Sequence, residues 1–202
     1  MMISRSLSGA VAALVLASGA AFAQGAAPAA TPQRPAGPPD IKMVGDWAVR
    51  CFQVQSVAPC DMYQEMQDQR TQQRVLSVSV AFVPSLNRHG IQIAVPLETS
   101  IAKGVVIQTS SYKSPVLKYS RCDRSGCFVE MPVDNAAIAS LAKSSKEAKV
   151  IVVADSTGKP VELRFSLDGF AAAQSQMAEQ ARAKATKPAA APAAPVPAAP
   201  AP

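Results

Sequence analysis

The chain has 202 residues, of which 49% are hydrophobic and 5% aromatic, and its formal net charge is +6. Between Val44 and Phe170 there are 14 Lys and Arg residues against 12 Asp and Glu, so most of the excess positive charge lies outside this segment. Because nucleic-acid-binding domains concentrate basic residues on one face and usually carry a recognisable module, the sequence argues against a nucleic-acid partner. A weak attraction to anionic lipid or polysaccharide stays open.

The first 23 residues, MMISRSLSGAVAALVLASGAAFA, have the order of a secretory signal peptide. Arg5 precedes an uncharged apolar stretch from Ala10 to Ala17, and small residues follow up to Ala23. The apolar stretch is shorter than the roughly 20 residues that a membrane-spanning helix needs. We therefore expect cleavage after Ala23, a mature chain that begins at Gln24 without stable membrane insertion, and a periplasmic or secreted location.

Composition divides the rest of the chain into a domain and two flanking segments. Ala and Pro dominate residues 24–39 and 187–202, and neither segment has an apolar period. Such segments cannot bury enough surface to offset the entropy of ordering. We expect a disordered linker over 24–43, one domain over 44–173, and a partly helical and then disordered tail over 174–202. About 130 residues suffice for one domain with a single core.

Short strands and turns alternate through the expected domain. Apolar and polar residues alternate in RVLSVSVAFV (74–83) and PVELRFSL (160–167), as in strands with one face in water. Noisier patterns of the same kind occur, in chain order, in GDWAVRCF, CDMYQEMQ, GIQIAVPL, GVVIQT, PVLKYSRC, GCFVEMPV and AKVIVVAD. With turn signals such as LNRHG and DSTGKP between them, these strands favour an all-β sandwich or barrel over a parallel α/β sheet.

Two helices are expected within and after this series. In DNAAIASLAKSS, Asp134 can cap a short helix, and Ile138 with Leu141 forms a small apolar face. A second helix runs from about Ala171 into AAQSQMAEQARAKA and is mostly polar. We expect the second helix to be frayed or only partly docked.

The four cysteines favour two disulfides. Cys122 ends one strand pattern and Cys127 begins the next, so DRSG forms a hairpin loop that brings the two thiols across neighbouring strands. Cys51 and Cys60 flank the loop FQVQSVAP in the same way. Among three possible pairings we favour Cys51–Cys60 and Cys122–Cys127, with a regulatory or intermolecular bridge as the alternative. The spacings do not fit a zinc site, which uses closer pairs, and we expect no metal or other cofactor.

The residues give little support to catalysis. His89, the only histidine, follows the turn signal SLNR without a G-x-S-x-G motif, and we interpret it as a solvated turn residue. Trp47 lies close to Cys51, and we interpret it as core packing against a disulfide, with a ligand platform as the alternative. We expect no catalytic residue. A hydrolase whose site is assembled by the fold is the alternative.

Five motifs resemble, in their order, the invasion-associated locus B family. They are GDWAVRC (45–51), APC (58–60), CDRSGC (122–127), DNAAIASL (134–141) and SLDGF (166–170). The resemblance covers about residues 44–173. It implies a secreted or periplasmic protein of Gram-negative bacteria with an immunoglobulin-like β-sandwich, named for a role in host-cell invasion and without established catalytic residues.

From these observations we expect an immunoglobulin-like antiparallel β-sandwich with one short helix, held by disulfides and flanked by disordered tails. We expect a non-enzymatic envelope protein whose partner is an unidentified envelope or host-surface protein or polymer. The sequence names no residue that binds this partner.

Overall fold

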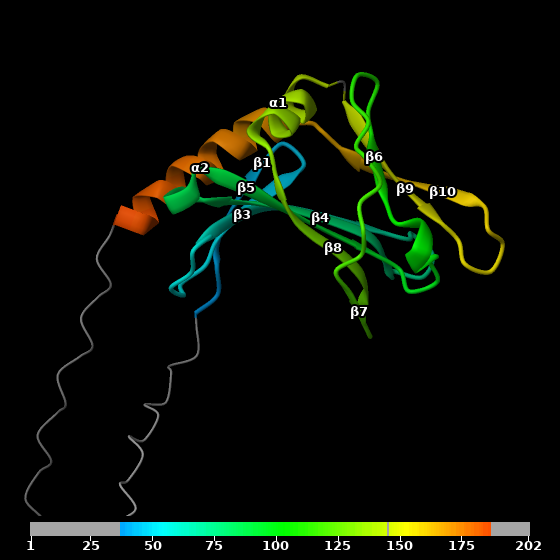
Figure 1. Ribbon diagram of the computed structural model, residues 1–202. Helices are drawn as coiled ribbons and strands as arrows, with labels where there is room; N and C mark the ends of the chain where they lie inside the picture. The colour runs from blue at the N-terminus through cyan, green and yellow to red at the C-terminus, as the bar shows by residue number, and fades with distance from the viewer. Residues whose placement is uncertain (1–36, 145, 187–202) are drawn as a thin grey trace, which may run out of the picture. The chain divides into compact units, whose positions relative to one another are not determined.

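The computed structural model describes residues 37–144 and 146–186. The predicted signal peptide, most of the predicted linker and the tail from Lys187 onward lie outside the described residues. In the described part, strands dominate and form two antiparallel sheets, with helices packed against the larger one (Figure 1). No helix there combines the length and the hydropathy that a membrane-spanning helix requires.

The larger sheet has seven strands in the order β1-β2-β3-β4-β5-β8-β7. The first five form a meander, in which each strand pairs antiparallel with the next in sequence. The strands are β1 (Asp40–Val44), β2 (Trp47–Cys51), β3 (Cys60–Gln67), β4 (Arg74–Val83), β5 (Arg88–Val95), β7 (Arg121–Asp123) and β8 (Gly126–Val133). The period of two predicted for residues 74–83 is present in β4, where Leu76, Val78, Val80 and Phe82 are buried on one face.

The smaller sheet has three strands in the order β10-β9-β6. They are β6 (Val106–Gln108), β9 (Glu147–Val153) and β10 (Pro160–Ser166). This sheet and the helices α1 (Asn135–Lys143) and α2 (Phe170–Thr186) lie on the same side of the larger sheet (Figure 1). Two 3-10 turns, η1 (Pro84–Leu86) and η2 (Ile101–Lys103), complete the described elements.

The core between the layers is centred on Trp47, which is fully buried. Its ring packs edge-on against Phe165 of β10 at 6.2 Å and Phe170 of α2 at 5.2 Å between ring centroids. One tryptophan therefore joins the larger sheet, the smaller sheet and α2. The interpretation of Trp47 as a core residue is confirmed, and so is the predicted class, an antiparallel all-β sandwich.

The prediction of a frayed or partly docked second helix is wrong. α2 packs against β2, β3 and β4, and its residues Phe170, Ala173, Met177, Ala178 and Ala181 are at most 4% exposed. The polar composition is misleading because the inward face of α2 consists largely of alanines. Alanine contributes little to a hydrophobic pattern, but its small side chain allows the helix to approach the sheet closely.

Regular structure extends beyond the predicted boundaries of 44–173 at both ends. β1 begins at Asp40, within the predicted linker, and pairs with β2 through a two-residue turn at Gly45 and Asp46. α2 continues to Thr186, within the predicted tail. One predicted strand, in contrast, is mostly irregular. In PVLKYSRC, only the bridge between Leu117 and Val105 and the start of the short β7 are regular.

Candidate functional site

Two of the five sequence motifs meet at one end of the sandwich. The Gly45 turn of GDWAVRC lies against the Gly169 turn of SLDGF, and the Asp46 N–H donates to the Asp168 carbonyl at 3.3 Å. Both glycines have positive φ, +59° and +74°. A Cβ on Gly45 would lie 2.6 Å from the Asp168 oxygen, and one on Gly169 would lie 2.5 Å from the Val44 oxygen. These motifs therefore fix how two turns pack together.

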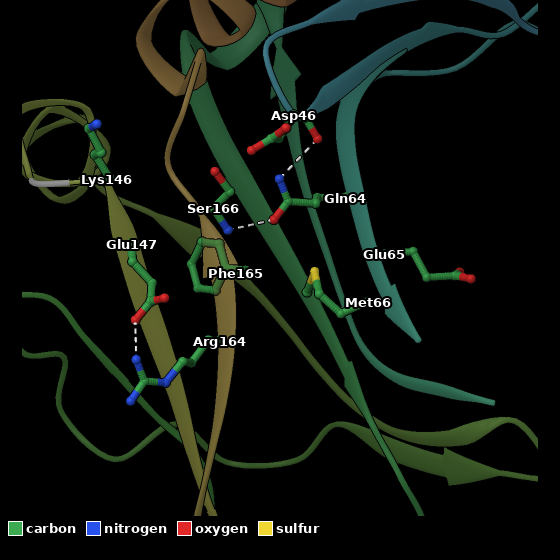
Figure 2. A pocket seen from close by; sticks show the side chains of 9 residues that line it. All are labelled: Asp46, Gln64, Glu65, Met66, Lys146, Glu147, Arg164, Phe165 and Ser166. Carbon is green, nitrogen blue, oxygen red and sulfur yellow. Dashed lines mark hydrogen bonds and ion pairs between the residues drawn. The ribbon is translucent and has the colours of Figure 1, made fainter. Parts of the chain in front are cut away.

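Gln64 links the same two turns from within β3. Its side chain is buried, its Nε2 donates to the Asp46 carbonyl at 2.9 Å, and its Oε1 accepts from the Ser166 N–H at 2.7 Å (Figure 2). Both ends of the amide are thus engaged in holding β10 against the larger sheet. Sequence analysis missed Gln64 because nothing in CDMYQEMQ distinguishes a buried glutamine from an exposed one.

A shallow cleft of about 500 Å³ opens beside Gln64 (Figure 2). Charged side chains line it, and Arg164 Nη1 lies 2.8 Å from Glu147 Oε1. Glu65 accepts hydrogen bonds from the Tyr63 hydroxyl and from Gln67, and these bonds lower the pKa of its carboxyl group. A carboxyl group with a lowered pKa is a poor proton donor near neutral pH. Glu65 is therefore a poor candidate for a proton donor in this cleft.

The interpretation of His89 as a solvated turn residue is wrong. The turn ends at Asn87, β5 begins at Arg88, and His89 falls on the inward phase of that strand with 5% exposure. Its Nδ1 lies 2.8 Å from Asn135 Oδ1 and its Nε2 lies 3.0 Å from Gln174 Nε2. Burial lowers the pKa of the imidazole. Its hydrogen-bond partners are amides, so His89 does not activate a hydroxyl or thiol nucleophile here.

The cysteines form the disulfides that the hairpin argument predicts. Cys51 is joined to Cys60 across β2 and β3, with Cα atoms 4.2 Å apart, and Cys122 to Cys127 across β7 and β8, with Cα atoms 4.0 Å apart. The first disulfide is buried beneath α2, where Gln180 Oε1 lies 3.0 Å from Cys51 Sγ. In the second, Cys122 is exposed. Neither pair has a free thiol for nucleophilic or redox chemistry.

We call the side of the larger sheet that points away from α2 and the smaller sheet the open face (Figure 1). Polar and aromatic side chains lie on it, as the strand register shows. The strand register aligns Tyr63, Ser79, Gln92 and Glu130 in one row across β3, β4, β5 and β8. Gln92 Nε2 donates to Glu130 Oε1 at 2.7 Å.

At one end of the open face, Arg50 stacks on Tyr63. The guanidinium carbon lies 3.8 Å from the ring centroid, and Arg50 Nε donates to Asp61 Oδ1 at 2.9 Å. Asp61 also accepts from the Ser79 hydroxyl at 2.7 Å. These contacts hold the guanidinium group over the ring, with 23% of the Arg50 side chain still exposed.

At the other end, Arg121 stacks on Phe128 with 3.8 Å between the guanidinium carbon and the ring centroid. Arg121 also pairs with Asp123 and with Glu130, the latter at 3.1 Å. Arginine and aromatic side chains that are already ordered lose little entropy on binding and are enriched in protein interfaces. Across the described ranges, no three His, Cys, Asp or Glu side chains converge as metal ligands would.

The comparisons with known proteins agree with this architecture. The model of the invasion associated locus B (IalB) protein family matches residues 47–178, well over half of the chain. The chain belongs to the invasion associated locus B family. The resemblance stated from the five motifs is thereby confirmed, and the match includes both disulfides and both arginine–aromatic pairs of the open face. β1 and the last residues of α2 lie outside it.

Two curated relatives in this family are the invasion protein B homologs of Brucella abortus strain 2308 and of B. abortus biovar 1 strain 9-941. Each is 32% identical over 128 residues, which is 63% of this chain and 73% of the relative. The crystal structure of invasion associated protein B from Bartonella henselae matches with a TM-score of 0.61 at 20% identity, over 69% of this chain and 96% of that one. The latter match supports the fold alone. None of these names designates an enzymatic activity.

Proposed function

We propose that this IalB-family protein is an exported, non-enzymatic envelope protein that binds a protein or polymer partner through its open face. The observation that carries the proposal is the pair of arginine–aromatic stacks, Arg50 on Tyr63 and Arg121 on Phe128, at the two ends of one sheet face. Export is supported by the signal-like start of the chain and by the two disulfides, which persist in oxidising compartments. The names of the relatives make a host-surface partner as well as an envelope partner relevant.

The proposal is tested by capture of partners from envelope fractions and from host-cell surface extracts. Immobilised protein is compared with Tyr63→Ala and Arg121→Ala, which remove one stacking side chain from each end of the open face. The matched control is Arg164→Ala in the cleft, whose side chain is 57% exposed and also paired with a carboxylate. We expect the same partner to be enriched by the wild type and by the control, and at least about tenfold less by the two open-face variants.

If both open-face variants still captured the partner and Arg164→Ala did not, the binding site would lie in the cleft. This result would contradict the proposal. The hydrolase alternative has its own test, in which purified protein is incubated with peptidoglycan and with a pool of peptides. Turnover that follows the protein through purification would overturn the non-enzymatic part of the proposal.

A further inference from the structure

β1 is an edge strand of the larger sheet and carries exposed apolar side chains. Ile41 and Met43 are 60% and 62% exposed, and their register opposite Arg50 and Ala48 places them on the open face. A flat edge with apolar side chains can pair with a further strand, and natural proteins usually protect such edges. The pattern of charges on β1 indicates which strand it accepts.

The backbone of β1 leaves bonding groups at its outer edge. β1 and β2 are joined by the two-residue turn at Gly45 and Asp46, so Val44 and Trp47 form the hydrogen-bonded pair next to the turn. Hydrogen-bonded and non-hydrogen-bonded pairs alternate along an antiparallel ladder. The N–H and C=O groups of Ile41 and Met43 therefore point toward the free edge.

The opposite face of β1 carries two charges of opposite sign. Asp40 and Lys42 point toward α2, where Asp40 Oδ2 lies 3.9 Å from Lys184 Nζ and Lys42 borders a groove of about 530 Å³ beside the helix. A lysine in an edge strand disfavours pairing with an arbitrary strand, because its charge requires a partner. β1 is complementary to itself in this respect, because Asp40 and Lys42 lie two residues apart on the same face of the strand.

Two self-pairing registers satisfy the outward-pointing backbone groups near the middle of β1. A pairing centred on Lys42 would place two lysines directly opposite each other, which is unfavourable. A pairing centred on Ile41 places Ile41 opposite its counterpart and Lys42 opposite Asp40 of the second copy, twice by symmetry. The groove beside α2 leaves room for these charged side chains.

We propose that two copies of this protein associate through antiparallel pairing of their β1 strands, centred on Ile41. The pairing joins the two larger sheets into one continuous sheet. It places the two Ile41 side chains opposite each other on the open face, with Met43 of each copy diagonal to Ile41 of the other. The arginine–aromatic pairs stay accessible. This inference goes beyond the proposed function and does not depend on it.

The first test measures the mass in solution of the protein purified from the periplasm of a Gram-negative host with both disulfides intact. We expect a dimer at tens of micromolar for the wild type. Ile41→Lys places two like charges directly opposite each other and weakens association at least about tenfold. The matched control is Val161→Lys on β10, an edge strand of the smaller sheet with a valine that is 39% exposed. The control remains dimeric.

The second test fixes the register by disulfide cross-linking. In the pairing centred on Ile41, the two Ile41 Cα atoms lie about 5.5 Å apart, within the range of a disulfide, whereas the two Met43 residues are separated by about 13 Å. Ile41→Cys therefore forms a covalent dimer on oxidation and Met43→Cys does not. A wild type that stays monomeric at about 100 μM, an Ile41→Lys variant that is as dimeric as the wild type, or cross-linking through Met43→Cys alone would each overturn the proposal.

Discussion

His89 is buried, and two side-chain amides contact its imidazole ring. The side-chain amide of Asn135 donates to the Asn87 carbonyl at 3.3 Å, which turns its Oδ1 toward the imidazole. Nδ1–H therefore donates to Asn135, and Nε2 accepts from the Gln174 amide. Burial, with the nearby positive charge of Arg182, lowers the pKa of His89. This buried residue links β5 to both helices.

The neutral His89 makes stability depend on pH in a window of its own. In the unfolded chain the imidazole titrates near its usual value of 6.5, whereas in the folded chain its pKa is lower. The contribution of neutral His89 to the free energy of unfolding is complete above pH 6.5. It is lost as the pH falls toward the folded-state pKa, because the unfolded chain then binds more protons than the folded one. We expect the urea midpoint to fall between about pH 7.5 and pH 5, and to fall less in His89→Gln.

The chain has one histidine, so no other imidazole contributes to this window. The carboxyl groups of Asp68, Asp123 and Glu162 have lowered pKa values and lose their contribution only in more acidic solution. An equally steep fall in His89→Gln would show that His89 is not the cause.

Gly45 provides a second test at the scale of single residues. At both Gly45 and Gly158 an alanine would have to adopt the positive φ of the native glycine, +59° and +65°. In Gly45→Ala the new Cβ would also lie 2.6 Å from the Asp168 oxygen, whereas in Gly158→Ala it would meet no atom within 4 Å. We expect Gly158→Ala to cost about 1 kcal/mol and Gly45→Ala more than about 3 kcal/mol in chemical denaturation. Equal costs would show that the two turns do not interlock.

Among the elements, α2 differs most from its prediction, and its docking is measurable. Met177 is fully buried against the sheet, and Glu179, two residues further along the helix, is exposed. We expect Met177→Ala to lower the free energy of unfolding by about 2–5 kcal/mol, whereas Glu179→Ala changes it by less than about 0.5 kcal/mol. If Met177→Ala lowered the free energy of unfolding by less than about 1 kcal/mol, as substitutions at the surface do, α2 would be only partly docked, as the sequence predicted.

The two disulfides differ in access, and their order of reduction follows from it. Both sulfur-bearing residues of Cys51–Cys60 are at most 1% exposed, whereas Cys122 lies on the exposed β7. Thiol–disulfide exchange requires the attacking thiolate to reach a sulfur atom. Under limiting reductant and native conditions, alkylation followed by mass analysis should label Cys122 and Cys127 first. Earlier labelling of Cys51 and Cys60 would show that α2 opens readily.

Elements were predictable from sequence where one face is in water and the other in the core. β4 coincides with a predicted run because its buried and less buried side chains alternate along most of the strand. β3 and β8 also coincide with predicted runs, although their burial alternates less regularly. β1 was not predicted, because its DIKMV segment follows a proline-rich stretch and has no fully buried face. The open face could not be predicted, because the register between strands, rather than the sequence within one strand, places Arg50 beside Tyr63 and Arg121 beside Phe128.

At the scale of the whole molecule, two truncations distinguish the sequence-based boundary from the one that the structure indicates. Ending the chain after Thr186 removes residues 187–202, whose Ala/Pro-rich sequence has no periodic apolar face to dock. Ending it after Ala173 also removes Met177, Ala178 and Ala181, each at most 4% exposed, and uncovers the core around Trp47. We expect the thermal midpoint to change by less than about 2 °C in the first case and to fall by more than about 10 °C in the second.

Calorimetry at equal protein concentration measures both midpoints, and concentration is held fixed because self-association would raise the apparent stability. Both truncations retain β1, so they leave the proposed pairing strand intact. A fall of several degrees after removal of residues 187–202 alone would mean that this segment packs on the domain. An unchanged midpoint after truncation at Ala173 would mean that the second half of α2 adds nothing to stability, despite the burial of its alanines against β2, β3 and β4.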